Sequence, residues 1–486
     1  MKPELRAELI RSLTRFIPAD AILSTEEERK PYECDGLTAY RQLPGLVVLP
    51  EDLAQLKGLV EVCREREVPL VMRGAGTGLS GGALPLADGV LVSLARWNRI
   101  LELDAVNRIA RVQPGVRNLA ITEAARPFGL YYAPDPSSQI ACSIGGNVCE
   151  NAGGIHCLKY GLTVNNVQGI RILTLSGDEV ELGGSGYDGP GYDLLALLHG
   201  SEGLLGIVTE VTVRLLPLPE ETRTLMAAFP SVGGAAAAVA AVIREGLVPA
   251  AMEMMDRPAI EAVEDYLHAG YPRSAGALII CDFDGPAVQV GEELAKAGRV
   301  MKQEGAEEVK VAADASERLR LWAGRKSAFP AIGRLTPDYY CMDGTIPRHR
   351  IAEVLAGIAD LAGCYGLRVA NVFHAGDGNI HPLIMYDSSA GELERVEALG
   401  REILELCIGV GGTITGEHGV GVEKLDSMCQ QFGRGELKLF HDVKHAFDPG
   451  GLLNPGKAVP TLSRCAELGG MHVHEGRLPH PELERF

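Results

Sequence analysis

Long apolar runs are missing from this 486-residue sequence. The longest apolar stretch, Gly233–Ile243, ends at Arg244 and is too short to cross a bilayer. Residues 1–16 are amphipathic and charged, without the uninterrupted apolar core of a secretory signal peptide. We therefore expect a cytoplasmic protein, or one held at the cytoplasmic face of the inner membrane only through the partners of a complex.

Basic residues are fewer than acidic ones in this sequence. The chain carries 46 lysines and arginines against 64 acidic residues, which gives a formal net charge of −18. A surface of that sign repels nucleic acid and anionic lipid headgroups at long range. We expect no nucleic-acid partner, and membrane contact only through partner proteins.

Cysteines spaced as metal or cluster ligands are also missing. None of the 11 cysteines belongs to a CxxC pair, and the nearest grouping is Cys142, Cys149 and Cys157. Iron–sulfur and structural zinc sites use closer spacings. The pattern indicates reduced, buried thiols, and a redox enzyme with this sequence would pass its electrons to another protein.

The residues that are present describe a folded chain of more than one domain. Its composition is 46% hydrophobic with 59 glycines, and its length is too great for one compact core. The proline-flanked segment 215–221 indicates a domain boundary. Beyond it, strands such as 277–285 alternate with helices such as 288–304, which is typical of an α+β domain.

A glycine-rich loop follows a predicted strand and begins at Arg73. It contains a formal GxGxxG at Gly76, Gly78 and Gly81, but Pro85 and another strand follow too soon for the helix of a Rossmann site. Five glycines in ten residues still let backbone N–H groups converge on a phosphate. The alternative is a flexible surface loop.

A second irregular stretch, residues 134–163, supports the binding interpretation. PDPSS (134–138) and SIGGNVCENAGG (143–154) show no core periodicity, and such backbone is costly unless something binds it. With these motifs, GSEGLLGIVTEV (200–211) and FDPGGLLNPGK (447–457), the chain resembles flavoproteins of the vanillyl-alcohol oxidase and p-cresol methylhydroxylase type. The resemblance implies contacts to FAD from these residues: Arg73, Gly74, Ala75, Gly76, Thr77, Gly78, Leu79, Ser80, Pro134, Ser138, Gly145, Gly146, Asn147, Asn151, Gly154, Glu202, Gly206, Val208 and Asn454. His156 and Cys157 could attach a flavin covalently, but the motif around them resembles the non-covalent branch.

Two further motifs carry chemistry. HAGDGNIH holds His374 and His381 on a loop, and GEHG adds Glu417 and His418. Two imidazoles and a carboxylate make a three-ligand metal site with open positions, which suits a 2-hydroxy acid that chelates through two oxygens. The alternatives are solvated loop histidines and a surface or helix-capping glutamate.

The same resemblance assigns roles to these residues. It implies that His374, His381 and Glu417 bind a divalent metal such as zinc or manganese, that His418 is the base, and that Arg325 binds the substrate carboxylate. A 2-hydroxy acid would then lose its hydroxyl proton to His418 and a hydride to the flavin.

The resemblance covers nearly the whole chain and implies an α+β fold. We expect an N-terminal segment and FAD-binding domain of the p-cresol methylhydroxylase type in 1–218, a ferredoxin-like substrate or cap domain in 219–415, a C-terminal segment returning to the flavin in 416–460, and a polar tail in 461–486. The implied reaction is oxidation of glycolate to glyoxylate, and of D-lactate to pyruvate. The implied partners are a second FAD-domain subunit and an iron–sulfur subunit that lead electrons to the respiratory chain. D-lactate or D-2-hydroxyglutarate dehydrogenation, and a non-catalytic flavin-carrying subunit, remain open.

Overall fold

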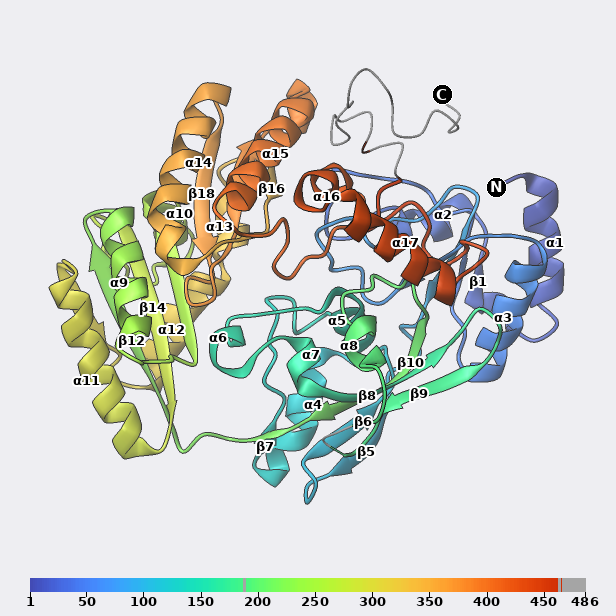
Figure 1. Cartoon of the computed structure of the whole chain (residues 1–486), viewed down its shortest axis with the longest axis horizontal. Helices are drawn as coiled ribbons and strands as arrows, with labels where there is room; N and C mark the ends of the chain where they lie inside the picture. Colours follow the sequence, from blue (N-terminus) through green and yellow to red (C-terminus); the bar gives the residue numbers. More distant parts are fainter. Residues whose placement is uncertain (187–188, 462–464, 466–486) are drawn as a thin grey trace.

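The computed structural model describes residues 1–186, 189–461 and 465. Most of the expected polar tail, 461–486, therefore lies outside the described residues. Within them, no helix is both long and apolar enough to span a membrane. Three main sheets organise the chain, two of them in its N-terminal half and one in its C-terminal half (Figure 1).

The first sheet is built on short buried strands near the N-terminus. Its order is β1 (Ile22–Leu23), β2 (Leu46–Val48), β4 (Val90–Ser93) and β3 (Leu70–Arg73), and the last three are parallel. Asp52 caps α3 (Leu53–Glu65) by accepting from the Gln55 N–H. The helices α3 and α1 (Pro3–Leu13) cover the sheet with apolar side chains such as Leu56 and Leu9.

The second sheet has five antiparallel strands. Their order is β5 (Ile100–Asp104), β6 (Ile109–Val112), β10 (Ile207–Arg214), β8 (Val167–Leu173) and β9 (Glu179–Gly183). Along the second half of β10, buried and less buried residues alternate, as expected when one face packs on a core. That core includes α4 (Asn118–Ala125) and α5 (Ile144–Glu150). The helix α5 corrects our expectation of irregular structure through 134–163: Ser143 caps it by accepting from the Gly146 N–H, which offsets the low helix propensity of two glycines.

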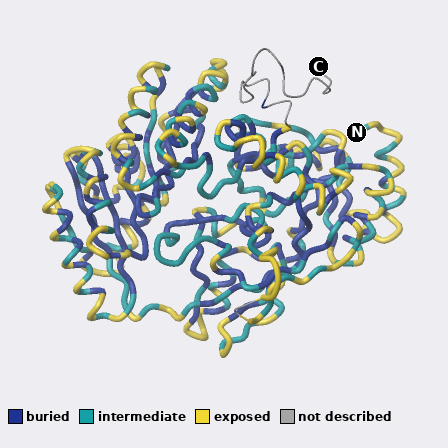
Figure 2. Tube along the Cα trace, viewed as in Figure 1, coloured by how far each residue is buried: buried dark blue, intermediate teal, exposed yellow. Residues whose placement is uncertain are grey.

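The third sheet has seven strands, with antiparallel pairing between all neighbours. Their order is β15 (Glu308–Val311), β12 (Glu221–Phe229), β14 (Ala277–Gly285), β13 (Ala251–Asp256), β18 (Arg368–Phe373), β20 (Pro382–Tyr386) and β16 (Asp338–Cys341). One face packs against α9 (Val232–Arg244), α11 (Ala287–Gln303), α14 (Ile351–Tyr365) and α15 (Leu393–Gly409). The other packs against α10 (Arg257–Leu267), α12 (Ala315–Lys326) and α13 (Ala328–Ile332). Because both faces are covered, β13 and β14 are buried along almost their whole length (Figure 2), which explains why most of their residues are apolar.

Short elements connect these layers. They are α2 (Glu26–Arg29), α6 (Cys157–Tyr160), α7 (Thr163–Asn166), α8 (Leu194–Leu198), and the two-stranded pairs β7 (Leu130–Tyr131) with β11 (Leu216–Pro217) and β17 (Gly344–Thr345) with β19 (Asn379–Ile380).

The C-terminal segment returns to the N-terminal half. It forms α16 (Leu425–Gln431) and α17 (Arg434–Phe447), and Lys444 Nζ of α17 donates to Leu204 O at 2.8 Å. Beyond α17, Leu453 makes a parallel bridge to Leu70 on β3. The expected α+β fold is confirmed, whereas the domain boundaries at 218, 415 and 460 stay predictions.

One expectation about cysteines is wrong. Cys429 on α16 and Cys465 form a disulfide, so the thiols are not all free and reduced. The two residues are 36 positions apart in the sequence, and only the packing of the returning segment brings their Cα atoms to 5.2 Å.

Candidate active site

A single large cavity gathers most of the residues singled out from the sequence. It encloses about 1480 Å³, a volume that includes the open space at its mouth. Its walls come from the first two sheets and the loops beside them, from α5 and α12, from His381 between β19 and β20, and from the loop after α15. These predicted residues line it: Arg73, Gly74, Ala75, Gly76, Thr77, Gly78, Leu79, Ser138, Gly145, Gly146, Asn147, Glu202, Gly206, Val208, Arg325, His381, Glu417 and His418.

The glycine-rich loop leaves β3 and returns into β4, so no helix follows it. Gly76 and Gly81 have φ of 69° and 76°, which side chains rarely adopt. Within the described part of the chain, none of the backbone N–H groups of residues 75–80 donates to a protein acceptor. A run of unpaired donors on a cavity wall fits the pyrophosphate of a dinucleotide such as FAD.

Five predicted cofactor residues do not line the cavity and support its walls instead. Ser80 Oγ donates to His418 O, and Pro134 O accepts from Asn118. Asn151 Oδ1 accepts from the Val164 N–H. The left-handed φ of 148° at Gly154 is one that other residues avoid, and a side chain there would meet the backbone of Asp135 at 2.6 Å. The Asn454 amide, expected at the flavin, donates to Gly82 O and Glu202 O.

The predicted metal ligands converge at one end of the cavity. Glu417 Oε1 lies 3.3 Å from His374 Nε2 and 3.2 Å from His381 Nε2. Their ligand atoms all lie within 4.8 Å of one another, so one cation could contact all three. His374 itself is buried and does not line the cavity.

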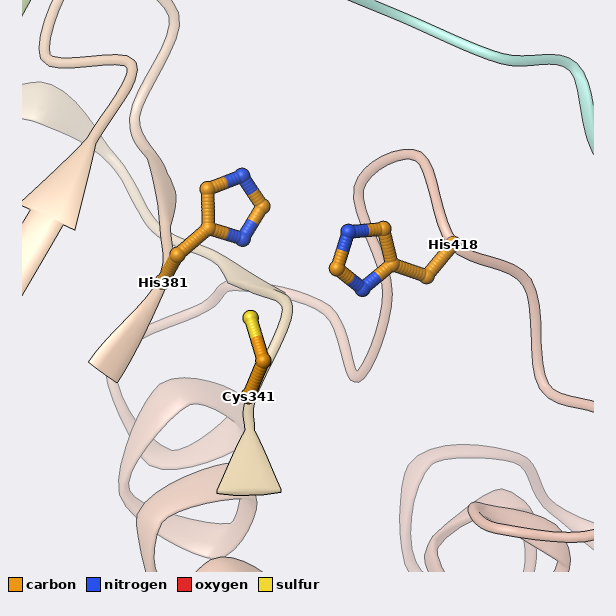
Figure 3. Close-up of side chains that lie close together, drawn as sticks. All are labelled: Cys341, His381 and His418. Carbon is orange, nitrogen blue, oxygen red and sulfur yellow. The ribbon is translucent and has the colours of Figure 1, made fainter. Parts of the chain in front are cut away.

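The proposed base stands beside this group. His418 Nε2 lies 4.0 Å from Glu417 Oε1, and the His418 ring stacks on His381 with centroids 5.0 Å apart. Figure 3 shows both imidazoles and the Cys341 thiol close together. Burial lowers the pKa of His418 to about 4, so the imidazole is unprotonated at neutral pH and free to accept a proton.

Asp343, just after β16, holds the GEHG loop and was missed from the sequence. Its carboxylate accepts from the N–H groups of Gly416, Glu417 and His418, and from Lys424 Nζ at 3.1 Å. Burial alone would raise the pKa of Asp343, but His418 and the Lys424 ammonium outweigh it and hold the pKa well below its usual range. A fixed anion thus gathers the backbone that presents both Glu417 and His418.

Glu253 on β13 was also missed. It is 1% exposed and joins two predicted site residues: Oε1 lies 2.7 Å from His374 Nδ1, and Oε2 accepts from Arg325 Nη2 at 2.6 Å. Burial would raise the pKa of Glu253, but Arg325 and His374 lower it further than burial raises it. The only signal in the sequence is one acid in the otherwise apolar run AMEMM.

Comparison with known proteins gives consistent matches. Residues 44–183 match the family described as an FAD binding domain, and residues 218–458 match the C-terminal domain of FAD linked oxidases. The glycolate oxidase subunit GlcD of Escherichia coli (strain K12) is 58% identical over 482 residues, covering 99% of this chain and 97% of that protein. A D-lactate dehydrogenase of Anaerostipes hadrus is 32% identical, covering 93% of this chain and 97% of its own.

A solved structure shares the fold. That of p-cresol methylhydroxylase with substrate bound superposes with a TM-score of 0.80 at 17% identity, covering 95% of this chain and 98% of that one.

Proposed function

The chain belongs to the FAD-linked oxidases, and from that premise we propose that it oxidises glycolate to glyoxylate. One observation carries the proposal: Arg325, His418 and two of the three predicted metal ligands, His381 and Glu417, line the same cavity as the glycine-rich loop. The name of the Escherichia coli relative favours glycolate as the substrate. We expect an FAD held non-covalently by the cavity-lining residues, and it would supply the hydride acceptor.

The substrate would be held at both ends. Arg325 is suited to the carboxylate, because its planar guanidinium can make two parallel hydrogen bonds. His374, His381 and Glu417 would hold a divalent metal such as zinc or manganese, which would make the hydroxyl group more acidic.

Proton removal falls to His418. The substrate loses its hydroxyl proton to this imidazole, and the carbon that bears the hydroxyl group loses a hydride to the acceptor. The products are glyoxylate, a proton and the reduced acceptor. Glu253 keeps Arg325 and His374 in place, and Asp343 keeps His418 in place.

A second candidate reaction is oxidation of D-lactate, because a relative covering 93% of the chain carries that name. D-2-hydroxyglutarate has the same reacting group and a longer chain. A non-catalytic flavin carrier is disfavoured, because this chain retains the complete set of two metal-ligand histidines, Glu417 and His418.

Steady-state kinetics with a dye acceptor test the proposed function. We expect the highest kcat/KM with glycolate, a lower one with D-lactate, and the lowest with D-2-hydroxyglutarate. A reversed order would replace glycolate as the substrate. If none of the three acids reduces the FAD-loaded protein, the chain is a non-catalytic flavin carrier and the proposed function is wrong.

We also infer that the chain works as one subunit of a complex, with a second FAD-domain subunit and an iron–sulfur subunit as its partners. The Escherichia coli relative is itself named a subunit. The cysteine spacing offers no cluster site for onward electron transfer. The purified chain should therefore reduce dyes but pass electrons to membrane quinone slowly; coupling as fast as in the assembled complex would contradict the partners.

Glu253→Gln tests how the site is positioned. A glutamine is similar in shape but loses the charge between Arg325 and His374, so we expect KM to rise and metal affinity to fall, with kcat/KM about 10- to 100-fold lower. The matched control is Asp256→Asn on the same strand, since Asp256 is also buried but pairs with Asn371 outside the site. Equal losses in both variants would reduce Glu253 to a general stabilising role.

A further inference from the structure

Cys341 lies beside two histidines of the active site, His381 and His418. It is the last residue of β16, and its strand partner on β20 is Leu383, two positions beyond His381. Figure 3 shows its sulfur next to His381 and His418. One ligand atom from each of these three residues lies within 4.8 Å of the others, so a single ion could contact all three.

These ligands differ in kind from the metal group described above. A thiolate and two imidazoles favour softer cations, such as zinc and cadmium, whereas replacing the thiolate with a carboxylate accommodates manganese as well. The two groups share His381. Its Nδ1 lies 3.2 Å from Met342 O, which leaves Nε2 as the nitrogen for a metal, and one Nε2 serves one ion at a time.

The Cys341 side chain is buried, with 4% of its surface exposed. Its Sγ donates to Met342 O at 3.4 Å. A bound cation would replace the thiol proton: the S–H bond breaks, a sulfur–metal bond forms, and the proton leaves to solvent. His381 and His418 line the cavity and Cys341 does not, so an ion would enter past the two imidazoles.

We propose that Cys341, His381 and His418 form an inhibitory site for a thiophilic divalent cation. A cation bound there takes the nitrogen lone pair of His418 and withdraws His381 from the neighbouring group. The inhibition rests on the proposed function, in which His418 is the base, whereas the binding site does not.

Cadmium titration of the FAD-loaded protein measures binding at the site and inhibition of the enzyme separately. We expect an ultraviolet thiolate-to-cadmium charge-transfer band to appear, with loss of glycolate-dependent dye reduction over the same cadmium range. In Cys341→Ser and Cys341→Ala the band should be lost. Half-inhibition, measured against each variant's own rate without cadmium, should then need at least about tenfold more cadmium.

Cys364→Ser is the control, because Cys364 is a free and exposed thiol on α14 that can bind cadmium adventitiously. Its band and its inhibition should match those of the unmodified chain. Band and inhibition that both survive in the Cys341 variants would overturn the site. A Cys341-dependent band without inhibition would support the site and contradict His418 as the base.

Discussion

His418→Ala is expected to lower kcat on the order of a hundredfold or more while FAD stays bound. The variant removes the group proposed to take the hydroxyl proton. It leaves the glycine-rich loop intact, because Ser80 of that loop bonds the backbone carbonyl of His418 and not its side chain. Stopped-flow reduction of the flavin by glycolate measures the loss directly, since it follows the chemical step alone.

Two controls separate proton transfer from general damage. His445→Ala changes an exposed histidine on α17 and should be neutral. Free imidazole should restore part of the activity of His418→Ala, because the truncated side chain leaves space for it beside Glu417. Near-normal flavin reduction in the variant would mean that another residue is the base.

Removal of a bound divalent metal is the second change with a large expected effect. Lewis-acid stabilisation is worth several kcal/mol, so metal-free protein should lose about a hundredfold or more in kcat/KM. Elemental analysis before and after chelation, with activity measured on readdition of zinc or manganese, checks this.

Glu417→Gln should reproduce the loss, because it removes the anionic ligand that faces both histidines. Glu210→Gln, in the five-stranded sheet and paired with Arg111 and Arg171, is the matched control. Full activity in a demonstrably metal-free protein would leave His374, His381 and Glu417 as hydrogen-bonding residues only.

The fold class could be predicted because its signals are local. The apolar run that follows Pro85 predicts a strand and so argues against a Rossmann site, and β4 does lie there. The helix α5 was missed because two glycines hide it, and the helix depends on its Ser143 cap.

Site residues were predicted only where they belong to a recognisable sequence motif. Glu253 contacts Arg325 72 positions away and His374 121 positions away, so no spacing in the sequence connects them. Cys341 at the end of β16 and Asp343 just after it are likewise isolated residues, and only the packing of the chain brings them to GEHG. Ser80 and Asn454 matched family motifs, yet in this chain their side chains bond the backbone of neighbouring loops.

The return of the chain to β3 has a consequence for folding during synthesis. β3 is the last strand of its sheet, and Leu453 forms a bridge to Leu70 on this strand. The Asn454 amide donates to Gly82 O, which is 372 positions away in the sequence. The nascent N-terminal half therefore leaves the ribosome with an open strand edge and an incomplete cofactor cradle, a state prone to mispairing. We expect productive loading of the flavin only after residues 453 and 454 have been synthesised.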